Sequence, residues 1–253
     1  MNLTYTGLEL RRVTRDFVTM FFVGVLPAFM YVIFGASMAY ADQPIGHGNV
    51  AMYIMVSMAA YGAVTATTGV GGSAAVERMQ GWGRQLGLTP MSDGHYVLIK
   101  AAVAFIISII PIALIYLIGF FTGAEASATA WLVSALIVLA GAAVFSLYGL
   151  LAGLLFRTEA AVGAASGSLV ILAFLGNIFF PLSGAMLTFA KFTPLYGFVA
   201  LARYPITEGT LISTTGPSTG SDPLWIPILN LVVWAVIFGV AALLLVRRGR
   251  SRQ

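Results

Sequence analysis

Residue types that carry out enzymatic chemistry are scarce in this chain. Cysteine is absent, which excludes disulfides and thiolate metal sites. The two histidines, His47 and His95, stand far apart without a neighbouring partner, so no metal centre is expected. Serine and threonine are plentiful, but no His, Asp or Glu is placed to activate one as a nucleophile. The sequence therefore predicts a protein that is not an enzyme.

The sequence also lacks a site that could capture energy from ATP. A phosphate-binding loop needs a Gly-Lys pair followed by Ser or Thr. The two lysines are Lys100, which follows Ile99, and Lys191, which follows Ala190. The glycine-rich run 69–72 closes an apolar segment and is interpreted as a helix-packing or fraying feature rather than a phosphate-binding loop. Any ATP hydrolysis must therefore be supplied by another polypeptide.

The acidic residues give no sign of ion coupling. Carriers driven by protons or sodium place carboxylates in the middle of the membrane. All nine acids here lie at or beyond the ends of apolar runs, and even Asp16 and Asp93 stand only at run entrances. A sodium site built from backbone carbonyls would leave no such trace, so an ion-coupled or passive carrier stays as the alternative function.

The most informative polar residues lie in the segment 74–89. If it is helical, its apolar residues recur at spacings of four, three and four. This stripe consists of Ala75, Met79, Trp82 and Leu86. Glu77, Gly81 and Arg84 lie on the opposite face, and Pro90 ends the helix. That face offers a carboxylate, a close-approach glycine and a guanidinium to a cytoplasmic partner; the alternative is an ordinary amphipathic helix at the membrane surface.

The elements that position these residues are membrane helices. The chain is 59% hydrophobic and 9% charged, whereas a soluble domain carries about 25% charged residues. Six runs approach the roughly 20 apolar residues that a membrane helix needs. They are 17–40, 50–72, 96–121, 130–156, 160–180 and 224–246. The predicted fold class is an all-α membrane protein with six transmembrane helices in one domain, 1–253.

The basic residues are distributed unevenly between the two sides of such a bundle. If the helices alternate in direction, eleven of the thirteen fall on one side, and the other receives only Lys191 and Arg203. The eleven are Arg11, Arg12, Arg15, Arg78, Arg84, Lys100, Arg157, Arg247, Arg248, Arg250 and Arg252. This positive-inside pattern predicts that both termini are cytoplasmic. Because the basic residues sit in short groups between apolar runs, we do not expect nucleic-acid binding.

Two further segments have a membrane character of their own. Residues 3–16 form an amphipathic stretch that predicts an interfacial helix with its arginines toward lipid headgroups, or alternatively a frayed basic terminus. The apolar run that follows resembles a signal peptide but is too long for one. On the outer side, 181–205 is too apolar for a solvated loop and is broken by Pro and Gly, which predicts two short re-entrant helices. Residues 209–221 are predicted to be an exposed loop.

Taken together, these features resemble the ABC-2-type transporter permeases, the membrane subunits of bacterial drug, antibiotic and polysaccharide exporters. That family's inner loop has an acid and a base, then a Gly, an apolar run and a Pro. The similar residues here are Glu77, Arg78, Gly81, 86–88, Thr89 and Pro90. The outer segment 177–184, followed by Pro194 and Arg203, is also similar to the region after that family's fifth helix. Trp82-Gly83 departs from the pattern, because many members carry polar residues there.

The resemblance implies a particular assembly in the bacterial plasma membrane. Two copies of the chain, or one copy and a close paralogue, would form a dimer in contact with membrane lipid. Each would dock on a cytoplasmic ATP-binding subunit that holds ATP and Mg, while this chain holds no cofactor. The coupling helix 74–89 would meet that subunit through Glu77, Arg78, Gly81 and Arg84 and would transmit nucleotide-driven closure.

The resemblance also implies a substrate path at the midline between the two copies. The second and fifth helices would line it. Their polar residues are Ser57, Tyr61, Thr65, Thr68, Ser166 and Asn177. These side chains either line the path or bond only to neighbouring helices. Gly163 and Gly167 form a GxxxG pair that permits close helix approach within or between subunits.

The expected function is export of a hydrophobic or amphipathic substrate, as in multidrug efflux and antibiotic resistance. Drugs, antimicrobial peptides, lipids, glycans and sodium are all compatible cargoes within that family. A non-transporting membrane scaffold or sensor is a further alternative, and an ATPase that co-purifies with the chain would separate the exporter from both alternatives.

Overall fold

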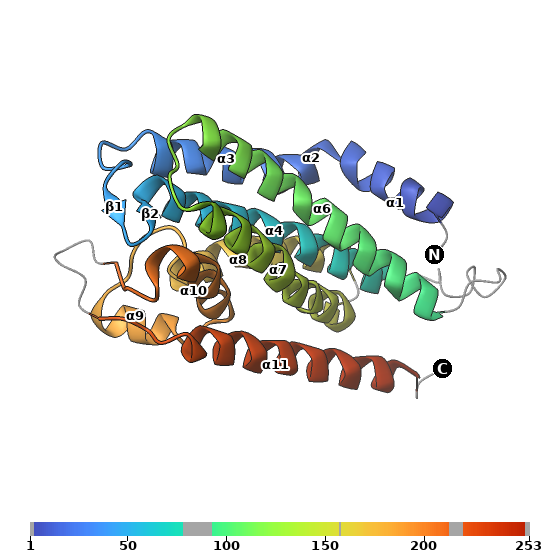
Figure 1. Cartoon of the computed structure of the whole chain (residues 1–253). Coiled ribbons are helices and arrows are strands. Elements are labelled where there is room, and N and C mark those ends of the chain that lie inside the picture. Colours follow the sequence, from blue (N-terminus) through green and yellow to red (C-terminus); the bar gives the residue numbers. More distant parts are fainter. Residues whose placement is uncertain (1–2, 78–92, 157, 213–219, 251–253) are drawn as a thin grey trace.

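The computed structural model describes residues 3–77, 93–156, 158–212 and 220–250. These residues form a bundle of helices (Figure 1). The elements are α1 Leu3–Arg15, α2 Phe17–Met20, η1 Phe21–Val25, α3 Leu26–Tyr31, η2 Val32–Ala36, β1 Pro44–Ile45, β2 Gly48–Asn49, α4 Val50–Glu77, α6 Asp93–Phe121, α7 Ala128–Phe156, α8 Glu159–Leu175, α9 Gly184–Ala190, α10 Pro194–Thr207 and α11 Trp225–Arg250. The all-α prediction is confirmed, since the only strands in these residues form one antiparallel two-residue pair.

Both described ends of the chain lie at the same end of the bundle, which we call the termini end (Figure 1). The start of α1, the last turn of α4, the first turns of α6 and the last turns of α11 gather there. The β1–β2 hairpin and α9 lie at the opposite end. Because long helices join the two ends, any site along them has a defined depth in the bundle.

Five helical stretches in the described residues are long and apolar enough to cross a membrane. They are Phe17–Ala36, Val50–Glu77, Ile99–Phe121, Ala128–Phe156 and Trp225–Leu245. They correspond to five of the six predicted runs. The exception is the run 160–180, because its helix α8 ends at Leu175 and its apolar part covers only Val162–Leu175. The helices α9 and α10 meet at a bend of 96° and raise the count to six only if they form one broken span.

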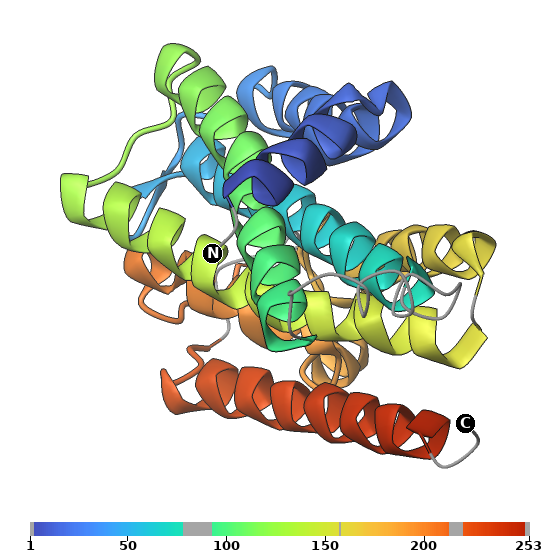
Figure 2. The ribbon, with the colours of Figure 1, turned by 90° about the vertical axis from the view of Figure 1, so that its right-hand side faces the viewer.

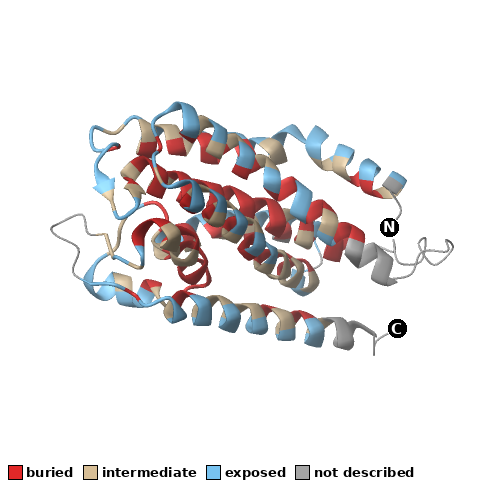
Figure 3. Cartoon of the chain, in the orientation of Figure 1, coloured by how far each residue is buried: buried red, intermediate tan, exposed pale blue. Residues whose placement is uncertain are grey.

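The outer surface of the bundle is apolar. Figure 3 shows exposed residues along the outward faces of the long helices, and many of them are large hydrophobic side chains. Examples are Phe120, Phe121, Leu132, Trp225 and Leu243. A water-soluble monomer seldom exposes apolar patches of this size. The chain is therefore a multi-pass membrane protein.

Helix α4 occupies the centre of the bundle and is 89% buried along its most apolar window, and most of its length is red in Figure 3. Its closest partner is α7, and glycines make that approach possible. A Cβ at Gly71 would collide with the carbonyl of Ser146, and one at Gly149 would collide with that of Thr68. The interpretation of the 69–72 run as a packing feature is thereby confirmed for Gly71. This packing also explains why α4 continues without a break to Glu77, past the predicted boundary at residue 72.

Candidate functional site

A cavity of about 610 Å³ lies between α4, the first span and α8. In Figure 2 the first span (blue) lies above α4 (teal), and α8 (yellow) lies to its right. One stripe of α4 residues, spaced four apart, forms the floor of this groove. The stripe is Tyr61, Thr65, Gly69, Ser73 and Glu77. At 1.5 Å per residue it extends for about 24 Å along the helix, so the groove runs from mid-bundle to the termini end.

The walls of the groove are apolar and contain small residues. Val18, Phe22 and Leu26 line it from the first span, and Ser166 and Val170 line it from α8. The groove also has a few polar groups on its floor and walls. Ligand sites for small molecules commonly have volumes of 300–1,000 Å³ and such a mixture of apolar walls and few polar groups. The groove therefore has the size and lining that suit an amphipathic molecule.

Glycines keep the groove open. A Cβ at Gly69, Gly163 or Gly167 would meet no heavy atom of another part of the chain within 4 Å. The GxxxG pair Gly163 and Gly167 therefore brings no other described helix of this chain into close contact. Instead, both glycines line the groove, where a larger side chain would reduce its width.

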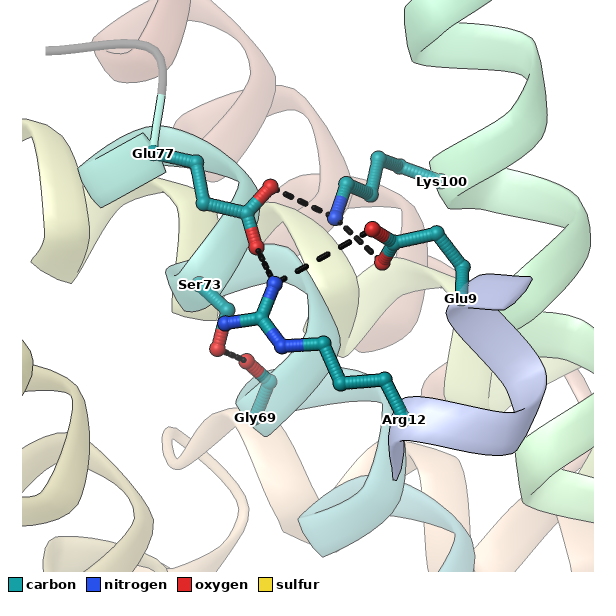
Figure 4. Close-up of polar contacts among 6 residues, drawn as sticks. All are labelled: Glu9, Arg12, Gly69, Ser73, Glu77 and Lys100. Carbon is teal, nitrogen blue, oxygen red and sulfur yellow. Dashed lines mark hydrogen bonds and ion pairs between the residues drawn. The ribbon is translucent and has the colours of Figure 1, made fainter. Parts of the chain in front are cut away.

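A ring of four charged residues closes the groove at the termini end (Figure 4). The Nζ of Lys100 lies 2.6 Å from Glu9 Oε2 and 2.6 Å from Glu77 Oε2. The Nη1 of Arg12 lies 2.7 Å from Glu77 Oε1 and 3.9 Å from Glu9 Oε1. Each acid thus faces both bases. We call Glu9, Arg12, Glu77 and Lys100 the charged ring.

The residues of the charged ring differ in how far they are buried. The Lys100, Glu77 and Glu9 residues are 6%, 7% and 8% exposed, whereas the Arg12 side chain is 60% exposed. Buried charges are tolerated only when they are paired and hydrogen-bonded, and removing one partner is strongly destabilising. We therefore expect Lys100 to matter for stability and Arg12 to contribute less, because solvent screens exposed pairs.

Two titratable groups near the charged ring have shifted pKa values, for different reasons. Burial, with the charges of Glu9 and Glu77 adding to it, raises the pKa of the Tyr5 phenol to about 12. At the start of α2, hydrogen bonds from the Thr19 hydroxyl and amide lower the pKa of the Asp16 carboxyl. Asp16 is the N-cap of α2 and faces the groove as a carboxylate.

A second polar cluster lies toward the opposite end and is built around Arg203 of α10. This residue is 4% exposed. Its Nε and Nη2 donate to the Ser57 hydroxyl, while Nη1 and Nη2 donate to the carbonyls of Asn177 and Ile178. The guanidinium also lies over the Tyr53 ring, 3.9 Å from its centroid. The adjoining cavity of about 40 Å³ has room for only a few waters.

The six residues expected to line a substrate path are divided between different places. Tyr61, Thr65 and Ser166 line the groove. Ser57 and Asn177 bind Arg203 instead. Thr68 donates to the Phe145 carbonyl of α7, which is the role of a residue that bonds a neighbouring helix. The role of the first three in transport stays a prediction.

Of the four predicted coupling residues, the structure describes Glu77. Arg78, Gly81 and Arg84 lie outside the described residues. Glu77 is the last residue of α4, and its carboxylate is held inside the chain by Arg12 and Lys100. It therefore differs from the expected partner-facing side chain, and a contact with an ATPase subunit stays a prediction.

Sequence reasoning missed the charged ring and the anchoring role of Arg203. One signal was available: Lys100 stands inside the predicted run 96–121, and a charge within a membrane segment requires a partner. The acids Glu9 and Glu77 were candidates for that partner only because the predicted topology places them on the same side of the membrane as Lys100. Nothing in the spacing selected them, because they lie 91 residues before and 23 residues before Lys100, in separate helices.

Comparison with known proteins supports a role in transport. No protein-family model matches the chain. A Bacillus subtilis (strain 168) protein named as a transport permease, YvfS, is 26% identical over 235 residues, which cover 91% of this chain and 90% of the relative. The similarity thus extends over nearly the whole length of both chains. With the apolar helices, it points to a membrane transport protein.

Proposed function

We propose that the chain is the membrane-spanning permease subunit of an ATP-binding-cassette exporter of the ABC-2 type. The observation that carries this proposal is the groove, which is about 610 Å³ in volume and combines apolar walls with a charged end. It lies in a chain whose sequence has no Gly-Lys pair and therefore no phosphate-binding loop. Similarity to a protein named as a transport permease supports the same reading.

The positive-inside pattern assigns the termini end to the cytoplasm in this proposal. The groove then lies at the depth of the cytoplasmic leaflet, with the charged ring at its end, and continues toward mid-membrane. An amphipathic cargo would place its apolar part against Phe22 and Val170 and its polar part near Thr65, Ser73 and the charged ring. Tyr61 lies at the deepest point of the floor stripe, where its ring packs edge-on against Phe179.

ATP and Mg would be bound by a separate cytoplasmic subunit, and a second permease copy would complete the path. Binding and hydrolysis there would move the cytoplasmic ends of the helices in this chain. The segment 74–89 is the predicted contact, since it combines the acid Glu77 with the bases Arg78 and Arg84 and with Gly81. Efflux of a hydrophobic or amphipathic compound, such as a drug or an antimicrobial, is the expected outcome.

Reconstitution tests the proposal directly. The chain is co-expressed with a candidate cytoplasmic ATP-binding subunit, and the complex is placed in liposomes with a fluorescent amphipathic dye. We expect dye transport that needs ATP and that stops when the phosphate-binding lysine of the ATPase is replaced. The chain alone should hydrolyse no ATP. Dye transport by the chain alone, driven by a proton or sodium gradient, would favour the ion-coupled carrier and refute the exporter.

A further inference from the structure

The charged ring joins three helices at one point. Glu9 and Arg12 belong to α1, Glu77 to the last turn of α4 and Lys100 to α6. Each helix contributes at least one charge, and each contact within the ring pairs opposite charges. Movement of any one of these helix ends by itself would separate a carboxylate from a base. The ring therefore favours their movement as one unit.

The local backbone gives α1 the freedom to follow such a movement. Between α1 and α2, Asp16 has an extended conformation with a ψ of 95°, so the helix is interrupted there. Figure 2 shows α1 turned across the termini end of the bundle toward α6. Its apolar side chains Tyr5, Leu10 and Val13 pack against the buried cluster that includes Ile99 and Val103 of α6. Glu9 lies on the same inward side of α1, so the charged ring adds to this apolar contact.

We propose that the charged ring mechanically couples α1 to the cytoplasmic ends of α4 and α6, and we call this coupling the joint. Displacement of these helix ends then changes the shape of the groove at its termini end. All four ring residues line the groove, as do Val13 and Asp16 next to them. A shift of α1 about the break at Asp16 therefore changes the shape of the groove at that end. This inference rests on the proposed function for its role in transport, but the coupling of the three helices does not.

The two bases have different tasks in this joint. Lys100 is buried and holds the α1 and α4 carboxylates together. Arg12 is the solvent-accessible member, so its contact to Glu77 is the one that can open and close without exposing a buried charge. Arg12 is thus a positioning residue, and its substitution should uncouple the helices without unfolding the chain.

A distance measurement on the chain in nanodiscs tests the joint without an ATPase. The protein has no cysteine, so Leu8→Cys on α1 and Ala101→Cys on α6, both exposed positions, give a unique pair of spin labels. Arg12→Glu puts a carboxylate next to Glu77 and should broaden the distribution of distances between the two labels. Full inversion of the ring, with Glu9→Lys, Arg12→Glu, Glu77→Arg and Lys100→Glu, restores every opposite-charge pair and should narrow it again. Arg11→Glu is the matched control, because Arg11 lies on α1 outside the ring.

Transport assays on the complex with the ATPase add the functional readout. We expect Arg12→Glu to lower cargo transport per ATP hydrolysed by about tenfold, the scale on which one charged contact acts, and full inversion to recover it. An unchanged label distance in Arg12→Glu refutes the joint. The joint is also refuted if the fully inverted variant folds but keeps a distribution of label distances as broad as that of Arg12→Glu, because charge pairing would then not be the cause. If the wild-type complex shows no ATP-driven transport while the distances respond as expected, the exporter assignment fails and the joint stands.

Discussion

At the scale of single residues, glycine determines how wide the groove is. The three groove glycines, Gly69, Gly163 and Gly167, face open space, whereas Gly71 and Gly149 permit the close contact between α4 and α7. The same residue type thus has two opposite uses within one bundle. Adding a side chain should consequently block the groove at the first set and break the fold at the second.

Gly167→Leu tests the groove. No heavy atom lies within 4 Å of its Cβ position, and leucine favours helix over glycine by about 0.8–1 kcal/mol, so the melting temperature should not fall. The leucine side chain would occupy the groove, and affinity for an amphipathic dye should fall about tenfold, which corresponds to 1.4 kcal/mol. Fluorescence titration in nanodiscs measures it.

Gly7→Leu is the matched control for that experiment. Its Cβ would also meet nothing within 4 Å, but Gly7 lies on α1 and does not line the groove. It should leave dye affinity unchanged. Equal affinities for the Gly167→Leu variant and the unaltered chain would show that the groove is not the binding site.

Lys100→Met removes the buried base of the charged ring while keeping a long apolar side chain. The Glu9 and Glu77 carboxylates would then lose their shared buried partner, and we expect a loss of about 3–5 kcal/mol in stability. Thermal unfolding in detergent measures the change. The exposed Arg11→Met should cause no comparable loss, and equal melting temperatures for both variants would contradict the strong role of Lys100.

At the scale of elements, α10 is held by apolar packing of residues such as Phe198 and by one charged side chain that reaches two other segments. Arg203 joins α10 to α4 through Ser57 and to the chain after α8 through the Asn177 and Ile178 carbonyls. Asn177 itself has a positive φ of 63°, and its side chain accepts from the Leu182 amide. The break after α8 and the placement of α10 are therefore fixed by the same cluster.

Arg203→Lys tests this anchor. A lysine ammonium keeps the charge but lacks the planar fork that reaches several acceptors and stacks on Tyr53. We expect α9 and α10 to exchange amide hydrogens faster, with a loss of about 2–5 kcal/mol for the truncated charged contacts. Hydrogen exchange read by mass spectrometry resolves the effect by segment. Faster exchange throughout the bundle, rather than in α9 and α10, would argue against a local anchor.

At the scale of the whole molecule, the two ends of the bundle differ in charge and in architecture. The termini end carries the charged ring, and the opposite end carries the bent pair α9 and α10 and the Lys191–Asp222 ion pair. By sequence, a bilayer would meet a basic side that has eleven Lys and Arg residues, and an acidic side on which four acids, Asp42, Glu125, Glu208 and Asp222, outnumber Lys191 and Arg203. This asymmetry is what sets the expected orientation.

Cysteine labelling measures that orientation. Thr4→Cys on α1 and Ser221→Cys near the start of α11 are both exposed positions, and the chain has no other cysteine. In intact cells an impermeant maleimide should label only the Ser221→Cys variant, and permeabilised cells should show both. Labelling of Thr4→Cys alone in intact cells would invert the proposed topology.

The sequence by itself determined the helical membrane character and most helix positions. Apolar runs near the length of a bilayer leave a chain few options, because backbone groups in hydrocarbon must bond within their own helix. Five of the six runs accordingly contain helices of spanning length. The Pro and Gly residues of 181–205 likewise indicated two short helices, seen as α9 and α10.

Only the tertiary structure decided which polar groups meet. Glu77 and Arg12 are separated by 65 residues, Lys100 and Glu9 by 91, and Arg203 and Ser57 by 146. Helical periodicity assigns a residue to a face but says nothing about which distant helix covers that face. For this reason Ser57 and Asn177, expected beside the cargo, belong to the Arg203 cluster, while Glu77, expected to face a partner, lies in the charged ring. The physical cause is that α4 packs on several helices at once, and each of its faces takes its function from the helix beside it.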